Sequence, residues 1–219
     1  MRMSAILVFT FSVVVLFSSS ALATDIGQSW HGAIRQTTKD YATKQGFNGS
    51  IAVMVNRGPV ANFSGGSTQD SQPITPTHRF SSGSVGKEFT TVAILKLVEE
   101  QKLSLDDSIL KYLDWLPQWA EDINVEHVLN HTSGLPKIRW YENIQTEEVI
   151  DQMTQIPELA FAPGSGYLYG NINVVVRALI VERVTGKTFT KYLEETFFKP
   201  LGMTNTVQLT QVNTREGIV

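Results

Sequence analysis

One candidate β-hairpin, set among segments with helical patterning, does most to limit how this chain can fold. Residues 49–56 and 60–64 are short runs rich in β-forming residues, and Arg57-Gly58-Pro59 separates them as a turn. Apolar residues at near-helical spacing predict a helix before the hairpin, over residues 26–45, with Gly46 as its stop. A two-stranded ribbon has little stability by itself and exposes unpaired strand edges. The hairpin therefore needs other elements to cover it.

The sequence changes to helical periodicity from Ser84 onward. Apolar residues recur at helical spacing between Phe89 and Val98, which predicts a helix from Ser84 to about Gln101. Gly186 is a suitable C-terminal cap for a helix that ends at Thr185. Further helices are predicted over residues 108–113, 125–130, 147–155, 171–185 and 189–198. The chain is thus expected to be a helix, a hairpin and then a long, mainly helical lobe.

Composition excludes several classes of function. The chain has 219 residues, 42% hydrophobic and 18% charged, which suits one sizeable core or a two-lobed domain. A formal net charge of -3 without a long basic run argues against a nucleic-acid partner. The absence of cysteine excludes disulfides, metal thiolates and a thiol nucleophile. Nothing in the composition predicts an oligomeric state.

The first residues have the pattern of a secretory signal peptide, predicted over residues 1–23. Arg2 supplies the positive end, residues 5–17 an apolar run, and Ala21-Leu22-Ala23 the small residues of a cleavage site. An uncleaved membrane anchor is the alternative, because residues 4–23 approach the ~20 residues that a bilayer span needs. The cleavage pattern favours export, so we expect a periplasmic or secreted protein without a stable membrane span.

A serine and a lysine stand three residues apart where the helix after the hairpin is expected to begin. Ser84 at a helix N-terminus would lie beside unpaired backbone N–H groups and the positive end of the dipole, where a developing anion is stabilised. Lys87 shares that helical face, and an amine whose pKa is lowered by burial can take the serine proton. An isolated S-x-x-K match is usually a helix cap and a solvated charge. Here Gly83 permits a tight turn, and Gly86 leaves room for a substrate.

A second candidate element lies in a turn-rich loop before a predicted helix, residues 163–171. Tyr169 could shuttle a proton between the serine oxygen and a leaving group, or it could simply fill the core. Asn171 is expected to cap the helix N-terminus, and it could also donate a hydrogen bond to the lysine or to a substrate amide.

Other kinds of site fit less well. Glu88 follows Gly86-Lys87 where a P-loop needs serine or threonine, and Ser84 lacks the leading glycine of G-x-S-x-G. His127 and His131 are four residues apart, but no glutamate follows the first, which disfavours a zinc protease. The tryptophans of the helical segment are predicted to cover the lobe rather than bind sugar rings: Trp115, Trp119 and Trp140.

Two further motifs make the chain resemble a known family. Residues 131–136 read H-T-S-G-L-P, and residues 200–203 read P-L-G-M with Thr206 following. Together with the serine–lysine and tyrosine motifs, in this order from about Phe47 to Thr206, they resemble the family of the class C serine β-lactamases and their D-alanyl-D-alanine carboxypeptidase and esterase relatives. S-x-x-K is a motif of penicillin-recognising enzymes.

The resemblance implies an α+β, β-lactamase/transpeptidase-like fold, an antiparallel sheet flanked by helices plus a helical lobe. It implies Ser84 as the acylated nucleophile, Lys87 as its activating partner, Tyr169 as the general acid/base and Asn171 as its helper. No cofactor or metal is implied, and the partner would be a small molecule: a β-lactam, a D-alanine peptide or an ester. The family usually has serine where this chain has Gly170. The histidine and serine of the H-T-S-G-L-P motif, His131 and Ser133, are assigned to structure.

The chain departs from the family pattern after Asn171, because no Lys-Thr-Gly or His-x-Gly triplet follows. The sheet is therefore expected to be incomplete, and the chain to be the front part of a longer protein. Residues 24–219 would form a truncated hydrolase domain, with the helix and hairpin in 24–82 and the helical lobe in 83–219. The function expected is an exported serine hydrolase acting on amide, β-lactam or ester bonds. The alternative is an inactive fragment that at most binds a ligand or partner.

Overall fold

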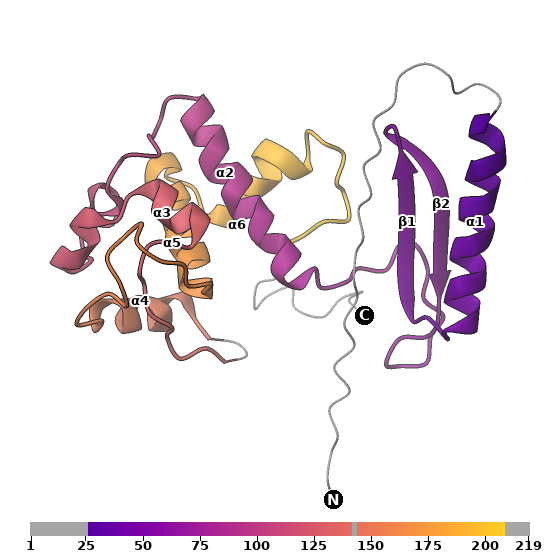
Figure 1. Cartoon of the computed structure of the whole chain (residues 1–219), viewed down its shortest axis with the longest axis horizontal. Coiled ribbons are helices and arrows are strands. Elements are labelled where there is room, and N and C mark those ends of the chain that lie inside the picture. Colours follow the sequence, from indigo (N-terminus) through magenta and orange to yellow (C-terminus); the bar gives the residue numbers. More distant parts are fainter. Residues whose placement is uncertain (1–25, 142–143, 209–219) are drawn as a thin grey trace, which may run out of the picture. The chain divides into compact units, whose positions relative to one another are not determined.

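Helices and one hairpin make up the structure, a computed structural model that describes residues 26–141 and 144–208 (Figure 1). The chain divides into two units, one up to Phe80 and one from Ser81. The predicted signal peptide lies outside the described residues. The first unit holds α1 (Ile26–Lys44), β1 (Gly49–Val55) and β2 (Gly58–Gly65). The second holds the 3-10 turn η1 (Gly83–Lys87), α2 (Glu88–Glu99), the 3-10 turns η2 (Ile109–Lys111) and η3 (Gln118–Asp122), α3 (Val125–Asn130), α4 (Thr146–Thr154), α5 (Asn171–Thr185), α6 (Phe189–Leu193) and the π-helical turn η4 (Glu194–Phe198).

In the first unit, α1 packs along the antiparallel hairpin of β1 and β2 (Figure 1). The predicted hairpin is confirmed, but its turn is Asn56-Arg57 rather than residues 57–59. Both turn residues have positive φ, 49° and 65°, as the tight turns that join twisted strands require. Pro59 consequently lies in β2, opposite Met54, where the register shifts next to Val53.

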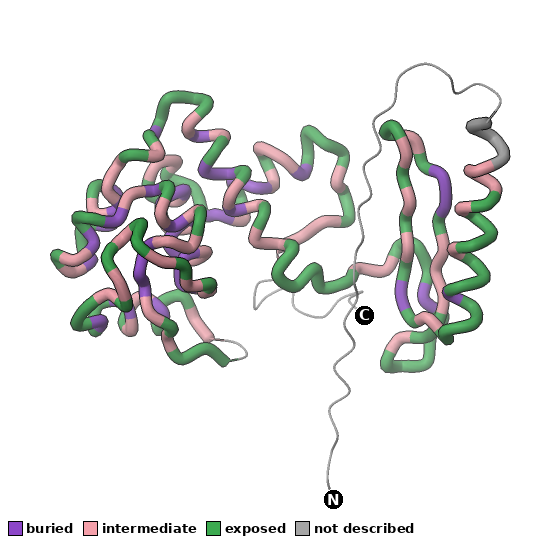
Figure 2. Tube along the Cα trace, in the orientation of Figure 1, coloured by how far each residue is buried: buried purple, intermediate pink, exposed green. Residues whose placement is uncertain are grey.

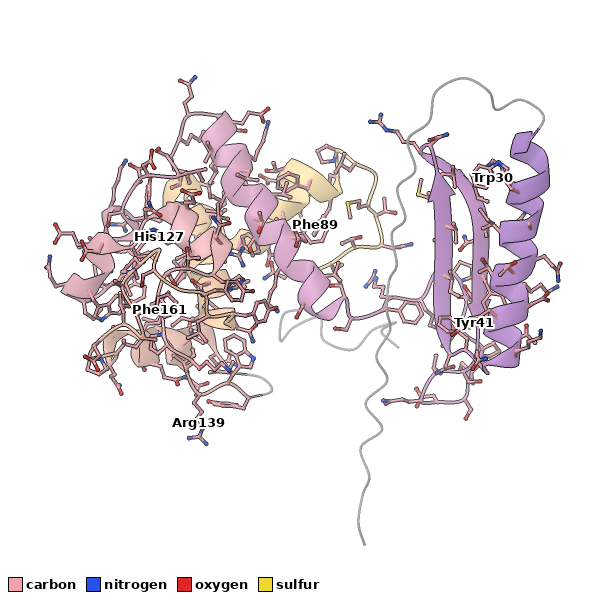
Figure 3. The ribbon with its side chains drawn as sticks, in the orientation of Figure 1. Trp30, Tyr41, Phe89, His127, Arg139 and Phe161 are labelled. Carbon is pink, nitrogen blue, oxygen red and sulfur yellow. The ribbon has the colours of Figure 1, made fainter. Side chains whose placement is uncertain are left out.

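In the second unit, α5 is the central helix and packs against α2, α3, α4 and α6. Its buried residues recur at helical spacing and belong to one core cluster with buried residues of the neighbouring elements; Figure 2 colours the buried stretches purple. On α2, Phe89 packs edge-to-face against Phe198 with ring centres 5.2 Å apart (Figure 3). This contact ties the start of α2 to η4.

Most helix bounds follow the sequence closely, with corrections at three places: the segment predicted as a helix at 108–113 forms the 3-10 turn Ile109–Lys111, and the starts of α2 and α5 differ. The segments predicted at 125–130 and 171–185 are helices over those residues, and Gly186 ends α5 with φ 65°. The helix predicted from Ser84 instead starts with η1 and becomes α-helical at Glu88. Asn171 was expected to be the N-cap, but Gly170 takes that position and Asn171 is the first helical residue. One-residue differences of this kind are normal at helix ends.

The fold class is α+β, as the sequence predicts: an antiparallel hairpin and a set of helices. Within the described residues the sheet has two strands. No helix of that part of the chain combines the length and hydropathy that crossing a bilayer demands.

Candidate active site

The 3-10 turn η1 brings Ser84 and Lys87 together. Side chains three residues apart eclipse one another in a 3-10 helix, so Lys87 lies directly over Ser84. The Lys87 Nζ donates a hydrogen bond to the Ser84 Oγ at 2.9 Å. Gly83 starts the turn with φ 51°, a left-handed conformation that favours glycine. Ser84 is exposed and Lys87 is half-buried, so the hydroxyl is accessible from solvent while the lysine is partly covered.

Tyr169 reaches the same oxygen from a segment 85 positions later in the chain. Its phenol O–H donates to the Ser84 Oγ at 3.2 Å, and its ring centre lies 5.5 Å from the Lys87 Nζ. The loop before α5 places it there, after a turn at Gly164 with φ 81°. The structure thus brings together three of the four residues that the sequence singled out.

Asn171 is the fourth, and it does not join this hydrogen-bonded group. It is half-buried at the start of α5. Among the described residues, its side chain makes no hydrogen bond to Ser84, Lys87 or Tyr169. Any role for its amide would require contact with a substrate.

The H-T-S-G-L-P segment anchors the tyrosine loop. Three backbone bonds join them: Gly164 N to Thr132 O at 2.8 Å, Leu168 N to His131 O at 3.0 Å and Ala160 N to Gly134 O at 2.8 Å. Gly134 has φ 74°, and a side chain there would meet the Phe161 carbonyl oxygen. The motif therefore needs glycine because two backbone segments approach closely at that point.

Positive charge and a hydrogen bond favour ionised Tyr169. The bond with Ser84 contributes most to holding the pKa of Tyr169 below its ordinary value, and Lys87 and Arg177 act in the same direction while burial opposes them. A lowered pKa raises the fraction of Tyr169 that is phenolate near neutral pH, and the phenolate is the form that can accept a proton.

Two buried polar residues of α5 were not recognised as part of this region. Arg177 is 2% exposed and donates from Nη1 to the Thr91 Oγ1 at 2.9 Å, one helical turn beyond Lys87. Asn173 is fully buried and accepts a hydrogen bond from the Ser133 Oγ at 2.7 Å. The position of Arg177 within the apolar run Val174 to Val181 is the sequence feature that could have indicated its burial, because the apolar residues around it form the buried stripe of the helix.

The site residues show no arrangement for a metal. Within residues 26–141 and 144–208, no three side chains of histidine, aspartate or glutamate cluster closely enough to hold an ion. The Nδ1 atoms of His127 and His131 each accept a backbone N–H, from Asn124 and Gly170 respectively.

Comparison with known proteins identifies the family of the chain. The beta-lactamase family model matches residues 34–210, which is most of the chain. The chain belongs to the beta-lactamase family. This confirms the resemblance inferred from the motifs.

Relatives within the family include penicillin-binding proteins and class C enzymes. The chain is 28% identical over 174 residues to Penicillin-binding protein 4* of Bacillus subtilis (strain 168), which covers 74% of this chain and 38% of that protein. It is 30% identical over 133 residues to a putative D-alanyl-D-alanine carboxypeptidase of Escherichia coli (strain K12), covering 54% of this chain and 31% of that protein. A class C beta-lactamase structure superposes with a TM-score of 0.72 at 25% identity, covering 89% of this chain and 55% of that one. The chain thus spans about a third of the length of these curated relatives.

Proposed function

We propose that this chain carries the nucleophilic half of a serine hydrolase of the β-lactamase and penicillin-binding type. The main support for this proposal is that the Ser84 Oγ accepts hydrogen bonds from both Lys87 and Tyr169. Membership of the beta-lactamase family supports the same reading. The substrate would be a small molecule with an amide, β-lactam or ester carbonyl.

The two hydrogen bonds define what must happen before attack. With Lys87 as ammonium and Tyr169 as phenol, both groups donate to Ser84, and neither can accept its proton. One proton must therefore leave the group of three first. The lowered pKa of Tyr169 makes its phenol a suitable group to lose it, and the titration would belong to the coupled group rather than to one residue.

The proposed acylation then follows ordinary acyl-transfer chemistry. The Ser84 Oγ attacks the carbonyl carbon while its proton passes to the Tyr169 oxygen. The tetrahedral intermediate collapses as the carbon–nitrogen or carbon–oxygen bond breaks, and the leaving atom takes a proton from Tyr169. Water later attacks the acyl-serine ester and releases Ser84. The Ser84 N–H, near the start of η1, is one of the backbone groups that lack an intrahelical acceptor and could stabilise the oxyanion.

We also propose that the protein is exported, on the strength of the pattern in residues 1–23. A periplasmic or secreted location would place it where peptidoglycan-derived peptides and β-lactams are found. The second candidate function is a chain that binds a ligand or partner without turnover. The share of its relatives that the chain covers, 38% of the Bacillus protein, favours testing that alternative directly.

Covalent labelling of Ser84 tests the proposal. The purified chain is incubated with a fluorescent penicillin and, separately, with an alkyl fluorophosphonate, and adducts are located by peptide mass spectrometry. We expect labelling of Ser84 that is lost in Ser84→Ala and retained in Ser82→Ala, a matched change of the exposed serine two positions away. The labelling rate should rise with pH as the group of three loses a proton. No adduct from either reagent would remove the claim of a reactive serine, and hydrolysis of nitrocefin or a p-nitrophenyl ester would remove the alternative of a silent binder.

A further inference from the structure

His131 makes more contacts with the tyrosine loop than the end of a helix requires. It terminates α3 in a left-handed conformation with φ 57°. Its carbonyl oxygen accepts a hydrogen bond from the Leu168 N–H at 3.0 Å, and its Nδ1 accepts one from the Gly170 N–H at 3.4 Å. These two bonds lie on either side of Tyr169, so a single residue holds both backbone neighbours of the tyrosine.

The imidazole ring also contacts the tyrosine ring itself. The ring centres of His131 and Tyr169 lie 4.7 Å apart with their planes inclined by 38°, and Tyr167 meets the same imidazole at 6.2 Å. These separations are within the range for interacting aromatic rings. Tyr169 is 44% exposed, so packing against the core restrains it only in part. The His131 ring supplies a restraint that burial does not.

The bond from Gly170 to the His131 Nδ1 depends on neutral imidazole. A histidine Nδ1 can accept a hydrogen bond only while it carries no proton. Burial lowers the pKa of His131, and the positive charges of Arg177 and Lys87 lower it further. Those two cations and the phenols of Tyr167 and Tyr169 are the titratable groups around the ring. Protonation would remove the acceptor for Gly170 and place a cation against Tyr169.

We infer that neutral His131 is a positioning residue for Tyr169, holding its backbone from both sides and its ring from one face so that the phenol reaches Ser84. This inference rests on the proposed function, because it assigns His131 to the orientation of the proposed acid/base. It goes beyond the structural role expected for the histidine of the H-T-S-G-L-P motif, since it makes the position of Tyr169 depend on the protonation of His131.

Two substitutions at position 131 separate the contacts. His131→Asn keeps an acceptor close to the place of Nδ1 and tolerates left-handed φ, but it removes the ring and its titration. His131→Leu removes the acceptor and the titration together. His127→Gln is the matched control on α3, because glutamine keeps a capping-box acceptor and the His127 Nδ1 bonds to the Asn124 N–H rather than to a neighbour of Tyr169.

Two readouts are measured on the full chain from pH 4.5 to 9: the rate of Ser84 acylation by fluorescent penicillin, and the carbon-13 signal of the Tyr169 ring, assigned with Tyr169→Phe. We expect His131→Leu to slow acylation by about tenfold to a hundredfold, as misplacement of a reacting group does. His131→Asn should recover part of this rate. In the wild type and His127→Gln, the Tyr169 signal should shift as His131 titrates, and this step should vanish in His131→Asn.

The two readouts separate failure of this inference from failure of the proposed function. If no form of the chain is acylated, the proposed function fails, and the Tyr169 signal alone decides the role of His131. An identical pH dependence of that signal in the wild type and in His131→Asn overturns the inference, whatever the rates. If His131→Leu fails to fold, His131→Asn still decides the question, because it preserves the backbone conformation and the acceptor.

Discussion

Replacing Gly134 by alanine tests why the H-T-S-G-L-P segment needs a glycine. A Cβ at this position would lie 2.1 Å from the Phe161 carbonyl oxygen, on backbone that has no flexible end to move away. The loop around Phe161 would have to retreat by about 0.9 Å for that distance to reach the 3.0 Å that real Cβ atoms observe. Gly186 is the matched control, because it also has positive φ, 65°, but open space where its Cβ would be.

The two substitutions should therefore differ in size. Gly186→Ala carries only the backbone penalty of a left-handed alanine, about 1 kcal/mol. Gly134→Ala carries the same penalty, the overpacking against Phe161, about 1–3 kcal/mol, and weakening of the Ala160 N–H bond to the Gly134 oxygen, about 1 kcal/mol. Its total of about 3–5 kcal/mol is a large fraction of the stability of an ordinary domain.

Urea unfolding measures both values. Tryptophan fluorescence reports on the second unit through Trp119, whose Nε1 donates to the Ile156 oxygen at 2.9 Å, and far-ultraviolet circular dichroism follows the helices. Gly134→Ala should lower the free energy of unfolding by at least about 2 kcal/mol more than Gly186→Ala, with unchanged slopes. Equal losses would refute the reasoning, because they would mean that φ alone, and not the close approach to Phe161, requires the glycine.

Two further predictions concern side-chain hydrogen bonds, one partly buried and one buried. Asp107 accepts hydrogen bonds from Tyr112, at 2.5 Å, and from Lys111, and these hold the pKa of Asp107 at about 2 against an ordinary value of 3.8. The depressed pKa of Asp107 stabilises the fold above pH 4, and this stabilisation is lost as the pH falls towards 2. Tyr112→Phe should therefore lower the free energy of unfolding by about 1–2 kcal/mol at pH 7 and make it depend less on pH in the acid range, as measured by urea unfolding. An unchanged acid limb would contradict this. Ser133→Ala removes a hydrogen bond to buried Asn173, so the unfolding free energy should fall by about 1–3 kcal/mol, whereas exposed Ser165→Ala should change little; similar effects would count against the buried bond.

Local sequence patterns determined most of the secondary structure. The helices at 125–130 and 171–185 and the hairpin follow from periodicity and turn residues, because these signals depend on neighbours along the chain. The pairing of Ser84 with Lys87 is local as well. Residues three apart share a face in an α-helix and in a 3-10 helix, so the error in the type of helix did not alter the pairing.

Other features required the folded chain. The sequence marked Tyr169 as a candidate, but only packing around α5 brings its phenol to a serine 85 positions earlier. It also assigned His131 to a turn, while the tertiary structure places that ring against Tyr169 and its Nδ1 at Gly170. Arg177 interrupts an apolar run in the sequence, but only the packing of α2 on α5 shows that its side chain is buried and bonded to Thr91.

The division has a physical cause. Helical and turn propensities act between residues a few positions apart, so the order of elements and the serine–lysine pair can be read directly from the chain. The contacts of His131, Tyr169 and Arg177 depend on how helices distant in sequence pack to bury apolar surface, and that packing determines which polar groups share a low-dielectric environment. The sequence by itself thus determined most of the elements and singled out the candidate residues, and the tertiary structure decided which of them meet.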